Sequence, residues 1–548
     1  MPRLRRVTLV LVAGSWIVSA RPFSGQPASM KDALRERLER LQAMDRAGVP
    51  RAEIAARRAL PMLYEEAGFE PFWTAVRVQT LLSLLRESAE DGLQPEDYHL
   101  SELTKLAPSF SGGAEAGARA QADVLATDGF FLLLYHLYLG KVDPKTLEAT
   151  WNFDPRPVGE SQGVAFVLDA LKTGKLREAV ARVRPDHWWY AKARAALAEY
   201  RGLAAKGGWP AVPPGKTLKA GMKDPRVVAL RRRLAATGEL SAQPLDSDAF
   251  DPAVVEAVKR FQERHRLGAD GVVAAGTLAE LNVPVEARVL QIRLNLERAR
   301  WALHEVTDDD LVVVDLAGFE VLYAKKNQVA WRSRIQIGKP YHATPIFKSR
   351  IDTVVFNPTW TIPPGILARE TIPAIRRDPG YLAKKGLEVV DAKGQKLDPA
   401  GVDWGSSKAS GYMVRQPAGE DNALGRVKIL FPNPYFVYLH DTPSKSLFEK
   451  SDRAFSHGCM RVDRPLELAE RVLNDPESWN AGTIAQTIEA GETKTVRLKN
   501  PVPVLIMYWT IDPVGEGKTE FKRDPYGRDP PLARALDEPF PSATKAKA

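Results

Sequence analysis

Cysteine is almost absent from this chain, because Cys459 is the only one in 548 residues. A single cysteine excludes an internal disulfide and leaves one thiol whose presence needs a reason. The eight histidines show no spacing typical of a metal site, and the chain has no glycine-rich phosphate-binding loop. We therefore expect neither a metal ion nor another cofactor.

Long apolar runs are also scarce, and the clearest one lies at the start of the chain. Three arginines, an apolar stretch at residues 7–18 and a small-residue site ending at Ala20 predict a signal peptide over residues 1–20. We expect export to the periplasm, with an uncleaved inner-membrane anchor as the alternative reading. No integral membrane span is expected after cleavage, which would lower the formal charge from +9 to +6.

Basic residues are not gathered into stretches with interleaved aromatics, and no nucleic-acid-binding module is recognisable, so nucleic acid is not an expected partner. The modest positive charge suits a polyanionic cell envelope. Apolar residues make up 44% and charged residues 26% of the chain, a typical globular composition. The length predicts three or four domains.

Helical periodicity dominates the first half of the chain, and it includes a short near-repeat. Asp224-Pro225 and Asp251-Pro252 each offer an N-cap followed by proline at the first helical position, and a third short helix is expected from Thr277. Three helices this short must pack on one another to bury their apolar faces. The predicted ranges are residues 21–50 for a linker and first helix, 51–215 for a helical domain, 216–283 for the three-helix domain and 284–308 for a connector helix.

The apolar period changes to two near residue 309, which predicts a mostly-β domain over residues 309–510. A polar segment at about 367–419 interrupts the strand pattern and is expected to cover something as a cap. Residues 511–548 are polar and proline-rich, which predicts a C-terminal tail that is at best partly ordered. The fold class expected for the whole chain is multidomain α+β.

Residues 435–462 hold the cysteine and two histidines. His440 ends an apolar run that alternates like a strand, and Tyr438 should share its face of the sheet. A thiol reacts as thiolate, so a nearby imidazole such as His440 could take the proton of Cys459 and later return it. Gly458 would let the backbone bend and aim the Gly458 and Cys459 amides at an oxyanion. A helix predicted at residues 465–473 should favour the thiolate through its dipole.

The same residues also have a structural interpretation, in which Cys459 is a small buried hydrophobe and the histidines pack or cap. Export favours the catalytic interpretation, since an unpaired thiol in an oxidising space is a liability unless it is used.

The arrangement H-x15-S-H-G-C-x-R, from His440 to Arg461, resembles the signature of the L,D-transpeptidases, the YkuD-type cysteine acyltransferases of bacterial cell walls. The resemblance implies that Cys459 is the nucleophile and His440 the general base. It also implies that Ser456 and His457 support the site. Arg461 would bind either a carboxylate of the substrate or the loop that carries the motif.

Other segments extend the resemblance to the large Gram-negative members of this family. GFEPFWT and DGLQPEDYHL are similar to their helical scaffold domain, and the run from Phe261 to Thr277 is similar to a three-helix peptidoglycan-binding domain. The helical domain is then a scaffold, the β domain is catalytic, and residues 367–419 cap the substrate groove. The three-helix domain could bind the cell wall or act only as a spacer.

The resemblance implies a reaction in peptidoglycan biosynthesis, and hence in cell-wall biogenesis and cell shape. A tetrapeptide stem would acylate Cys459 with release of D-alanine, and an acceptor stem would then form the crosslink; carbapenems would acylate the same thiol. Two rivals stay open. The same pair could hydrolyse these bonds as an L,D-carboxypeptidase or amidase, or the chain could be a non-catalytic peptidoglycan-binding scaffold. Other cell-wall synthesis proteins are possible partners.

Overall fold

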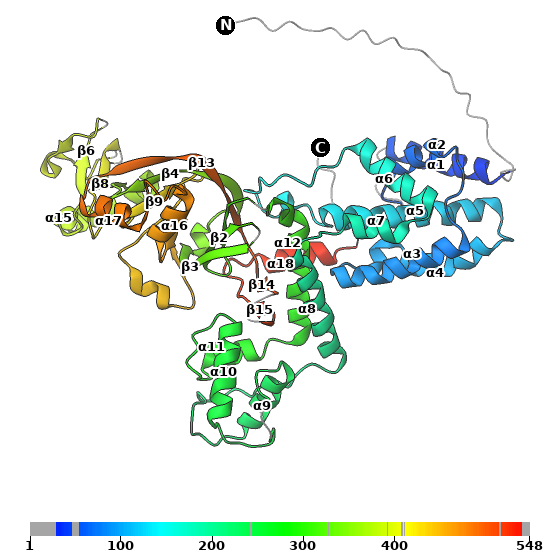
Figure 1. Cartoon of the computed structure of the whole chain (residues 1–548), viewed down its shortest axis with the longest axis horizontal. Coiled ribbons are helices and arrows are strands. Elements are labelled where there is room, and N and C mark those ends of the chain that lie inside the picture. The colour runs from blue at the N-terminus through cyan, green and yellow to red at the C-terminus, as the bar shows by residue number, and fades with distance from the viewer. Residues whose placement is uncertain are drawn as a thin grey trace, which may run out of the picture.

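The computed structural model describes residues 29–46, 54–241, 244–307, 309–326, 328–391, 393–406, 409, 411–513 and 517–539. The predicted signal peptide, residues 1–20, lies outside the described residues. Helices from the first part of the chain lie at one end of an elongated molecule, and the strands of the β domain lie at the other (Figure 1). A small helical domain projects from the middle, below the long helices that join the two ends.

The N-terminal helices form a bundle around α5, and its hydrophobic core is separate from the other cores. Helix α5 is long and apolar enough to cross a membrane by length and composition alone. This corrects the expectation that no such helix follows the predicted signal peptide. However, 78% of its apolar window is buried inside the structure, so α5 is the central helix of the bundle. The helices of this bundle are α1 (Met30–Arg46), α2 (Ala59–Glu66), α3 (Ala75–Glu87), α4 (Leu100–Leu106), α5 (Ala116–Leu139), α6 (Glu160–Thr173) and α7 (Leu176–Val183). The next helix, α8 (Trp188–Ala205), packs into the core of the β domain instead.

The small domain contains α9 (Arg226–Ala236), α10 (Pro252–Arg264) and α11 (Ala275–Leu281) around a core of its own. The second predicted cap is present, since the Asp251 carboxylate accepts a 3.1 Å hydrogen bond from the Val254 amide at the start of α10. At α9 the Asp224 carboxylate accepts from the Arg226 amide at 2.9 Å. Two isolated β-bridges tie the turns together and make this domain a compact unit.

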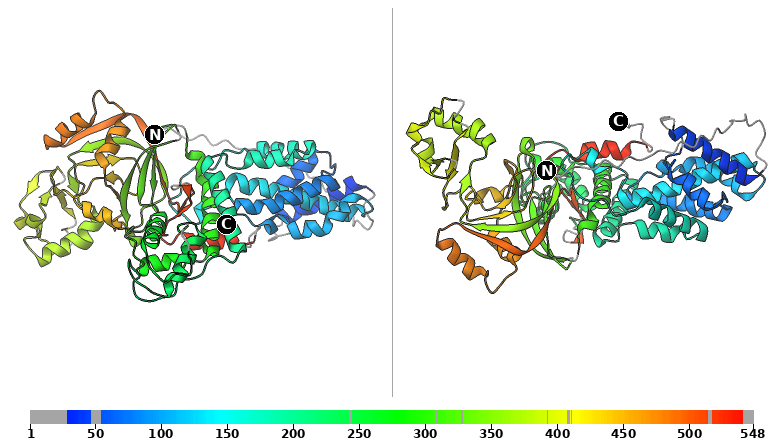
Figure 2. Two further views of the ribbon diagram at one scale, coloured as in Figure 1. Left: turned by 60° about the horizontal axis from the view of Figure 1, so that its bottom comes forward. Right: turned by 90° about the horizontal axis from the view of Figure 1, so that it is seen from above.

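The predicted connector, α12 (Val285–Ala302), is more than a link, because its arginines are buried against other domains. It lies side by side with α8 at the centre of the molecule (Figure 2). Arg300 pairs with Glu297 and donates to the Asp91 carbonyl at 2.8 Å. The Val142 amide donates to the Glu297 carboxylate at 2.8 Å, so this buried pair of α12 contacts the scaffold helices on both of its members.

The β domain is built on a nine-stranded sheet in the order β11-β3-β12-β10-β9-β4-β13-β1-β2. Strands β2 and β3 also pair with each other, so the sheet curls back on itself around the largest hydrophobic core. Helices α16 (Pro465–Leu473) and α17 (Ala481–Glu489) pack outside it. The strands are β1 (Leu311–Asp315), β2 (Glu320–Lys325), β3 (Gln328–Gly338), β4 (Phe347–Phe356), β9 (Val427–Leu430), β10 (Leu439–His440), β11 (Ala454–Ser456), β12 (Met460–Val462) and β13 (Lys494–Met507).

The segment predicted to be a cap folds as a separate subdomain at the far end of the β domain (Figures 1 and 2). Its small sheet has the order β5-β8-β6-β7, and its hydrophobic core is distinct from that of the main sheet. The elements are β5 (Trp360–Thr361), α13 (Pro364–Ile366), the π-helical turn η7 (Leu367–Thr371), α14 (Ile372–Arg377), α15 (Tyr381–Lys384), β6 (Glu388–Val390), β7 (Lys396–Leu397) and β8 (Met413–Gln416).

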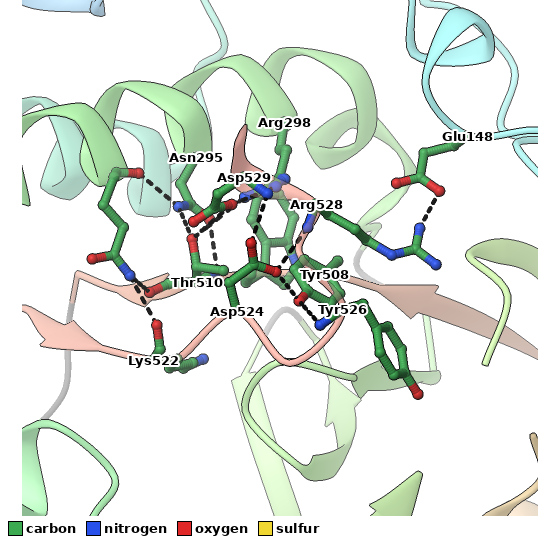
Figure 3. A network of polar contacts seen from close by, with 12 residues as sticks. Glu148, Asn295, Arg298, Tyr508, Thr510, Lys522, Asp524, Tyr526, Arg528 and Asp529 are labelled. Atoms are coloured by element: carbon green, nitrogen blue, oxygen red, sulfur yellow. Dashed lines mark hydrogen bonds and ion pairs between the residues drawn. The ribbon is translucent and has the colours of Figure 1, made fainter. Parts of the chain in front are cut away.

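The expectation of a loosely ordered tail from residue 511 does not hold for residues 511–513 and 517–539. They form β14 (Ile511–Asp512), β15 (Glu520–Phe521) and α18 (Asp529–Asp537). The segment folds because it uses the surface of α12: the Asn295 amide donates to Thr510, and Arg298 pairs with Asp529 (Figure 3). The polar composition of this segment gave no sign of its ordered structure, because that order depends on contacts with distant elements.

Candidate functional site

Two neighbouring strands bring the predicted site residues together. β10 and β12 run parallel, with Leu439 opposite Met460 and His440 opposite Arg461, and the Met460 amide donates to the Tyr438 carbonyl at 3.0 Å. Side chains two residues apart on a strand share a face. Tyr438, His440, Cys459 and Arg461 therefore lie on one face of the sheet.

The sulfur of Cys459 lies beside Tyr438. The main-chain N–H and the hydroxyl of Tyr438 act on the sulfur as donors and lower the pKa of the thiol, and the thiol donates to the Phe436 carbonyl at 3.8 Å. Burial nevertheless raises the pKa of the Cys459 thiol. Helix α16, whose dipole was expected to favour the thiolate, begins at Pro465, beyond β12. Burial is the largest influence on the pKa of this thiol.

His440 is positioned as a neutral base. Its Nδ1 lies 2.5 Å from the Asp441 carbonyl oxygen, which only accepts, so Nδ1 carries the proton and Nε2 presents a lone pair. Burial, followed by the nearby charge of Arg461, lowers the pKa of His440 to about 3. Within the described residues the hydrogen bonds of the thiol go to Tyr438 and Phe436 and not to His440. The Tyr438 ring, 5.5 Å from the imidazole, lies against both groups.

The backbone around Gly458 is fixed by three hydrogen bonds. Gly458 has φ +116, a conformation that favours glycine. Its amide donates to the Ser456 hydroxyl at 3.0 Å, Ser456 donates to the Cys459 carbonyl at 2.5 Å, and Thr344 donates to the Gly458 carbonyl at 2.8 Å. The expectation that the Gly458 amide binds an oxyanion is therefore wrong in this structure, since Ser456 occupies it. Of the two predicted amides, that of Cys459 is left for this task.

His457 faces the cap instead of the sulfur. Its Nε2 lies 2.8 Å from a carboxylate oxygen of Glu370 in η7, and its ring lies 5.1 Å from that of His342. The nucleophile loop and the cap are thus joined directly. Sequence reasoning could not find Glu370, because 87 residues separate it from His457.

Two cations border the sulfur. Arg461, half-buried, donates to Gln336 at 3.2 Å, and burial lowers its pKa while Cys459 opposes that change. Lys428, opposite His440 on β9, places its Nζ 4.2 Å from the centre of the Tyr438 ring. Burial lowers the pKa of Lys428, whereas the nearby Cys459 raises it. Lys428 was missed from the sequence, although a lysine within an apolar strand is a signal that could have found it.

Two aromatic side chains near the thiol are unusually exposed. Phe436 is 85% exposed and has φ +56, which is rare for a bulky residue, and Tyr341 is 72% exposed beside His342. Backbone strain of this kind concentrates at functional sites. No signal in the sequence distinguished these residues from ordinary packing residues.

The C-terminal segment supports the nucleophile loop from behind. Tyr526 donates to the Gly338 carbonyl at 2.8 Å and also contacts the Thr344 hydroxyl, which in turn holds Gly458. Tyr526 lies within a polar network that includes Tyr508, Asp524 and Arg528 (Figure 3). Among the residues that the structure describes, no group of three or more histidine, cysteine and acidic side chains stands where it could hold a metal ion.

Comparison with known proteins finds three families along the chain. Residues 58–197 match the family described as "Scaffold domain", residues 223–281 the "Putative peptidoglycan binding domain", and residues 309–504 the "L,D-transpeptidase catalytic domain" known as YkuD. The predicted multidomain α+β class is confirmed by these matches and by the fold.

A curated protein of Haemophilus influenzae, named "Putative L,D-transpeptidase", is 31% identical over 200 residues, which are 36% of this chain. The match spans 40% of that relative's length. Two solved structures are similar at low identity. An L,D-transpeptidase from Xylanimonas cellulosilytica is 16% identical, covers 54% of this chain and 99% of its own, and has a TM-score of 0.18. L,D-transpeptidase 1 of Mycobacterium tuberculosis is 14% identical, covers 36% and 60%, and has a TM-score of 0.15.

Proposed function

Since the chain carries a YkuD-type L,D-transpeptidase catalytic domain beside a peptidoglycan-binding domain and a scaffold domain, we propose that it crosslinks peptidoglycan stem peptides through a thioester on Cys459. The observation that carries this proposal is the placement of the only thiol on one face of the sheet with a neutral, buried imidazole, a donating tyrosine and two cations. This is the set that thiol acyl transfer needs.

In the first half-reaction, Nε2 of His440 takes the proton of Cys459 as the sulfur attacks the carbonyl that precedes the terminal D-alanine. The C–N bond breaks, His440 gives the proton to the departing D-alanine amine, and a thioester remains. Because its low pKa makes the imidazolium costly, His440 holds this proton only briefly. The charges of Lys428 and Arg461 favour the thiolate and the negative oxygen that develop meanwhile.

In the second half-reaction, an amine of the acceptor stem attacks the thioester and loses a proton to His440. The C–S bond breaks and the sulfur recovers that proton, so the enzyme returns to its neutral thiol and imidazole. The hydroxyl and main-chain N–H of Tyr438 already donate to the sulfur, and they support it each time it carries charge.

Hydrolysis is the rival outcome, because water could attack the same thioester and make the protein a carboxypeptidase or amidase. The contact between Glu370 of the cap and His457 favours transfer, since it holds the cap against the nucleophile loop and restricts water. A non-catalytic scaffold is disfavoured by the polar surroundings of the thiol, which a packing cysteine would not need.

Further parts of the proposal concern place and partners. The peptidoglycan-binding domain supports the cell wall as the substrate, and the leader at residues 1–20 supports export to the periplasm. We also propose that carbapenems acylate Cys459, because the same sulfur can attack the carbonyl of their strained lactam ring.

The decisive experiment incubates the protein with purified disaccharide tetrapeptide and determines the masses of the products. Transfer predicts a dimer that lacks one D-alanine, whereas hydrolysis gives a shortened monomer. Cys459→Ala should give neither product, and a variant that still formed dimers would remove the proposed nucleophile. Carbapenem treatment should add one adduct, on the peptide that contains Cys459.

A further inference from the structure

A cavity of about 960 Å3 lies where the peptidoglycan-binding domain, the catalytic sheet and the C-terminal segment meet. Its walls come from the start of α8, the end of α10, strands β1 to β3 and the loop at residues 448–453. These elements converge at the middle of the molecule (Figure 1). Cys459 does not line this cavity, so it is separate from the catalytic site.

Three cations in the cavity wall have main-chain carbonyls as their hydrogen-bond partners. Arg453 donates to the carbonyls of Ile335, Lys450 and Phe319. Arg260 donates to the Glu239 carbonyl, and Lys518 donates to those of Thr237 and Gly238. Within the described part of the chain none of these three cations forms an ion pair, so their charge is available to an anionic ligand.

Several acidic groups of the wall are already neutralised within the protein. Asp315 pairs with the buried Lys522 at 2.5 Å, and Glu520 pairs with Arg266 at 2.7 Å. Burial and two neighbouring arginines lower the pKa of Arg453 to about 10, which reflects crowding of positive charge on this side of the cavity. Nine basic and seven acidic side chains line the cavity, so its wall carries a small excess of positive charge.

The edge of the cavity carries an exposed aromatic ring and further cationic side chains. Trp188, at the start of α8, is 45% exposed, and the side chain of Arg332 is 54% exposed with its nearest carboxylate, that of Glu320, 3.8 Å away. Lys450 is also exposed. An exposed indole can stack on the apolar face of a sugar ring, while arginine and lysine bind carboxylates.

We propose that this junction cavity binds a peptidoglycan strand, with the sugar against Trp188 and the stem carboxylates against the cations at Arg332, Lys450 and Arg453. The proposal rests on the proposed function for the identity of the ligand. It places a second strand-binding site between the two domains, apart from the thiol.

The cavity is also connected to the catalytic loop. Residues 448–453 lie between His440 and Ser456, and β11, which follows them directly, pairs with the end of β3. A peptidoglycan strand bound in the cavity would therefore contact the segment that links His440 to Cys459. Such a position suits an acceptor strand, whose stem must reach the thioester.

The test uses hydrogen–deuterium exchange on the full chain carrying Cys459→Ala, with disaccharide tetrapeptide as the probe. We expect slower exchange in the segments 185–190 and 260–268, which contain residues that line the cavity and lie outside the catalytic motif. Protection confined to residues 435–447, residues 454–462 and the cap would overturn the proposal. Uncharged chitotetraose and the free stem peptide, tested separately, show which part of the ligand supplies the binding.

Charge reversal gives the second arm. Arg332→Glu and Lys450→Glu should each weaken the binding of the probe at least five-fold, and Trp188→Ala should weaken the binding of the sugar arm. Arg497→Glu, an exposed arginine of β13 outside the cavity, serves as the matched control and should change nothing. Equal affinity in all four variants would refute the cavity site.

The two proposals fail in different ways. If wild-type protein forms crosslinked dimers and the cavity variants bind and react as it does, the junction site is wrong and the proposed function stands. If the protein forms no crosslinks but the probe still protects residues 185–190 and 260–268, the site stands and the reaction is wrong.

Discussion

Replacing Tyr438 by phenylalanine removes one hydrogen-bond donor from the sulfur of Cys459 while keeping the ring. A hydrogen bond to a charged group contributes about 1.5–3 kcal/mol. Since one pKa unit corresponds to about 1.4 kcal/mol, the pKa of the thiol should rise by about one to two units. At a pH below that pKa, the thiolate fraction and the rate of alkylation should fall about 10- to 100-fold.

The assay is simple because the chain has a single cysteine. Iodoacetamide labelling of the intact protein, followed by mass spectrometry at several pH values from 6 to 10, gives the rate of alkylation of that thiol alone at each pH. Tyr435→Phe is the matched control, since the Tyr435 hydroxyl contacts the Thr150 carbonyl at 3.5 Å and not the sulfur. An unchanged pH profile for Tyr438→Phe would contradict the assignment of Tyr438 as the donor.

Three further changes have defined outcomes. Lys428→Met should raise the pKa of the Cys459 thiol by less than the tyrosine change, as read from the same labelling profile, because Lys428 acts only through its charge; a lower pKa would contradict this. Glu370→Gln should speed hydrogen exchange in the cap by up to about five-fold, because an exposed ion pair contributes at most about 1 kcal/mol; unchanged exchange would mean that the contact with His457 does not hold the cap. His136 has its pKa lowered from 6.5 to about 3 by burial, so its contribution to stability is complete above pH 6.5 and is lost as the pH falls toward 3. Between pH 7 and 4.5 the free energy of unfolding should therefore fall by about 3 kcal/mol less for His136→Gln than for wild type, as measured by urea unfolding. An equal fall in both proteins would contradict the assignment.

Local patterns predicted the elements that depend on neighbouring residues. Asp251 caps α10 as its spacing indicated, and the apolar, β-branched run at residues 311–314 forms a strand of the main sheet. Tyr438 and His440 share a face because strand geometry fixes that relation over two residues. These features can be predicted from neighbouring residues alone, without knowing how the rest of the chain folds.

The features that the sequence did not reveal depend on pairing between distant segments. Lys428 reaches the thiol only because β9, β10 and β12 lie next to one another in the sheet. The Gly458 amide turned out to be occupied because Ser456 folds back toward it, a detail of side-chain placement. Burial raises the pKa of Cys459, and the extent of this burial depends on packing by segments that are distant in the sequence.

The C-terminal segment supports the reactive loop from a position later in the chain. Tyr526 braces Thr344 and Gly338 from a position 67 residues beyond the thiol. The ribosome therefore completes Cys459 well before the segment that braces its loop exists. A chain that ends before residue 526 would carry the thiol without this brace, because Gly338 and Thr344 would lose the Tyr526 hydroxyl.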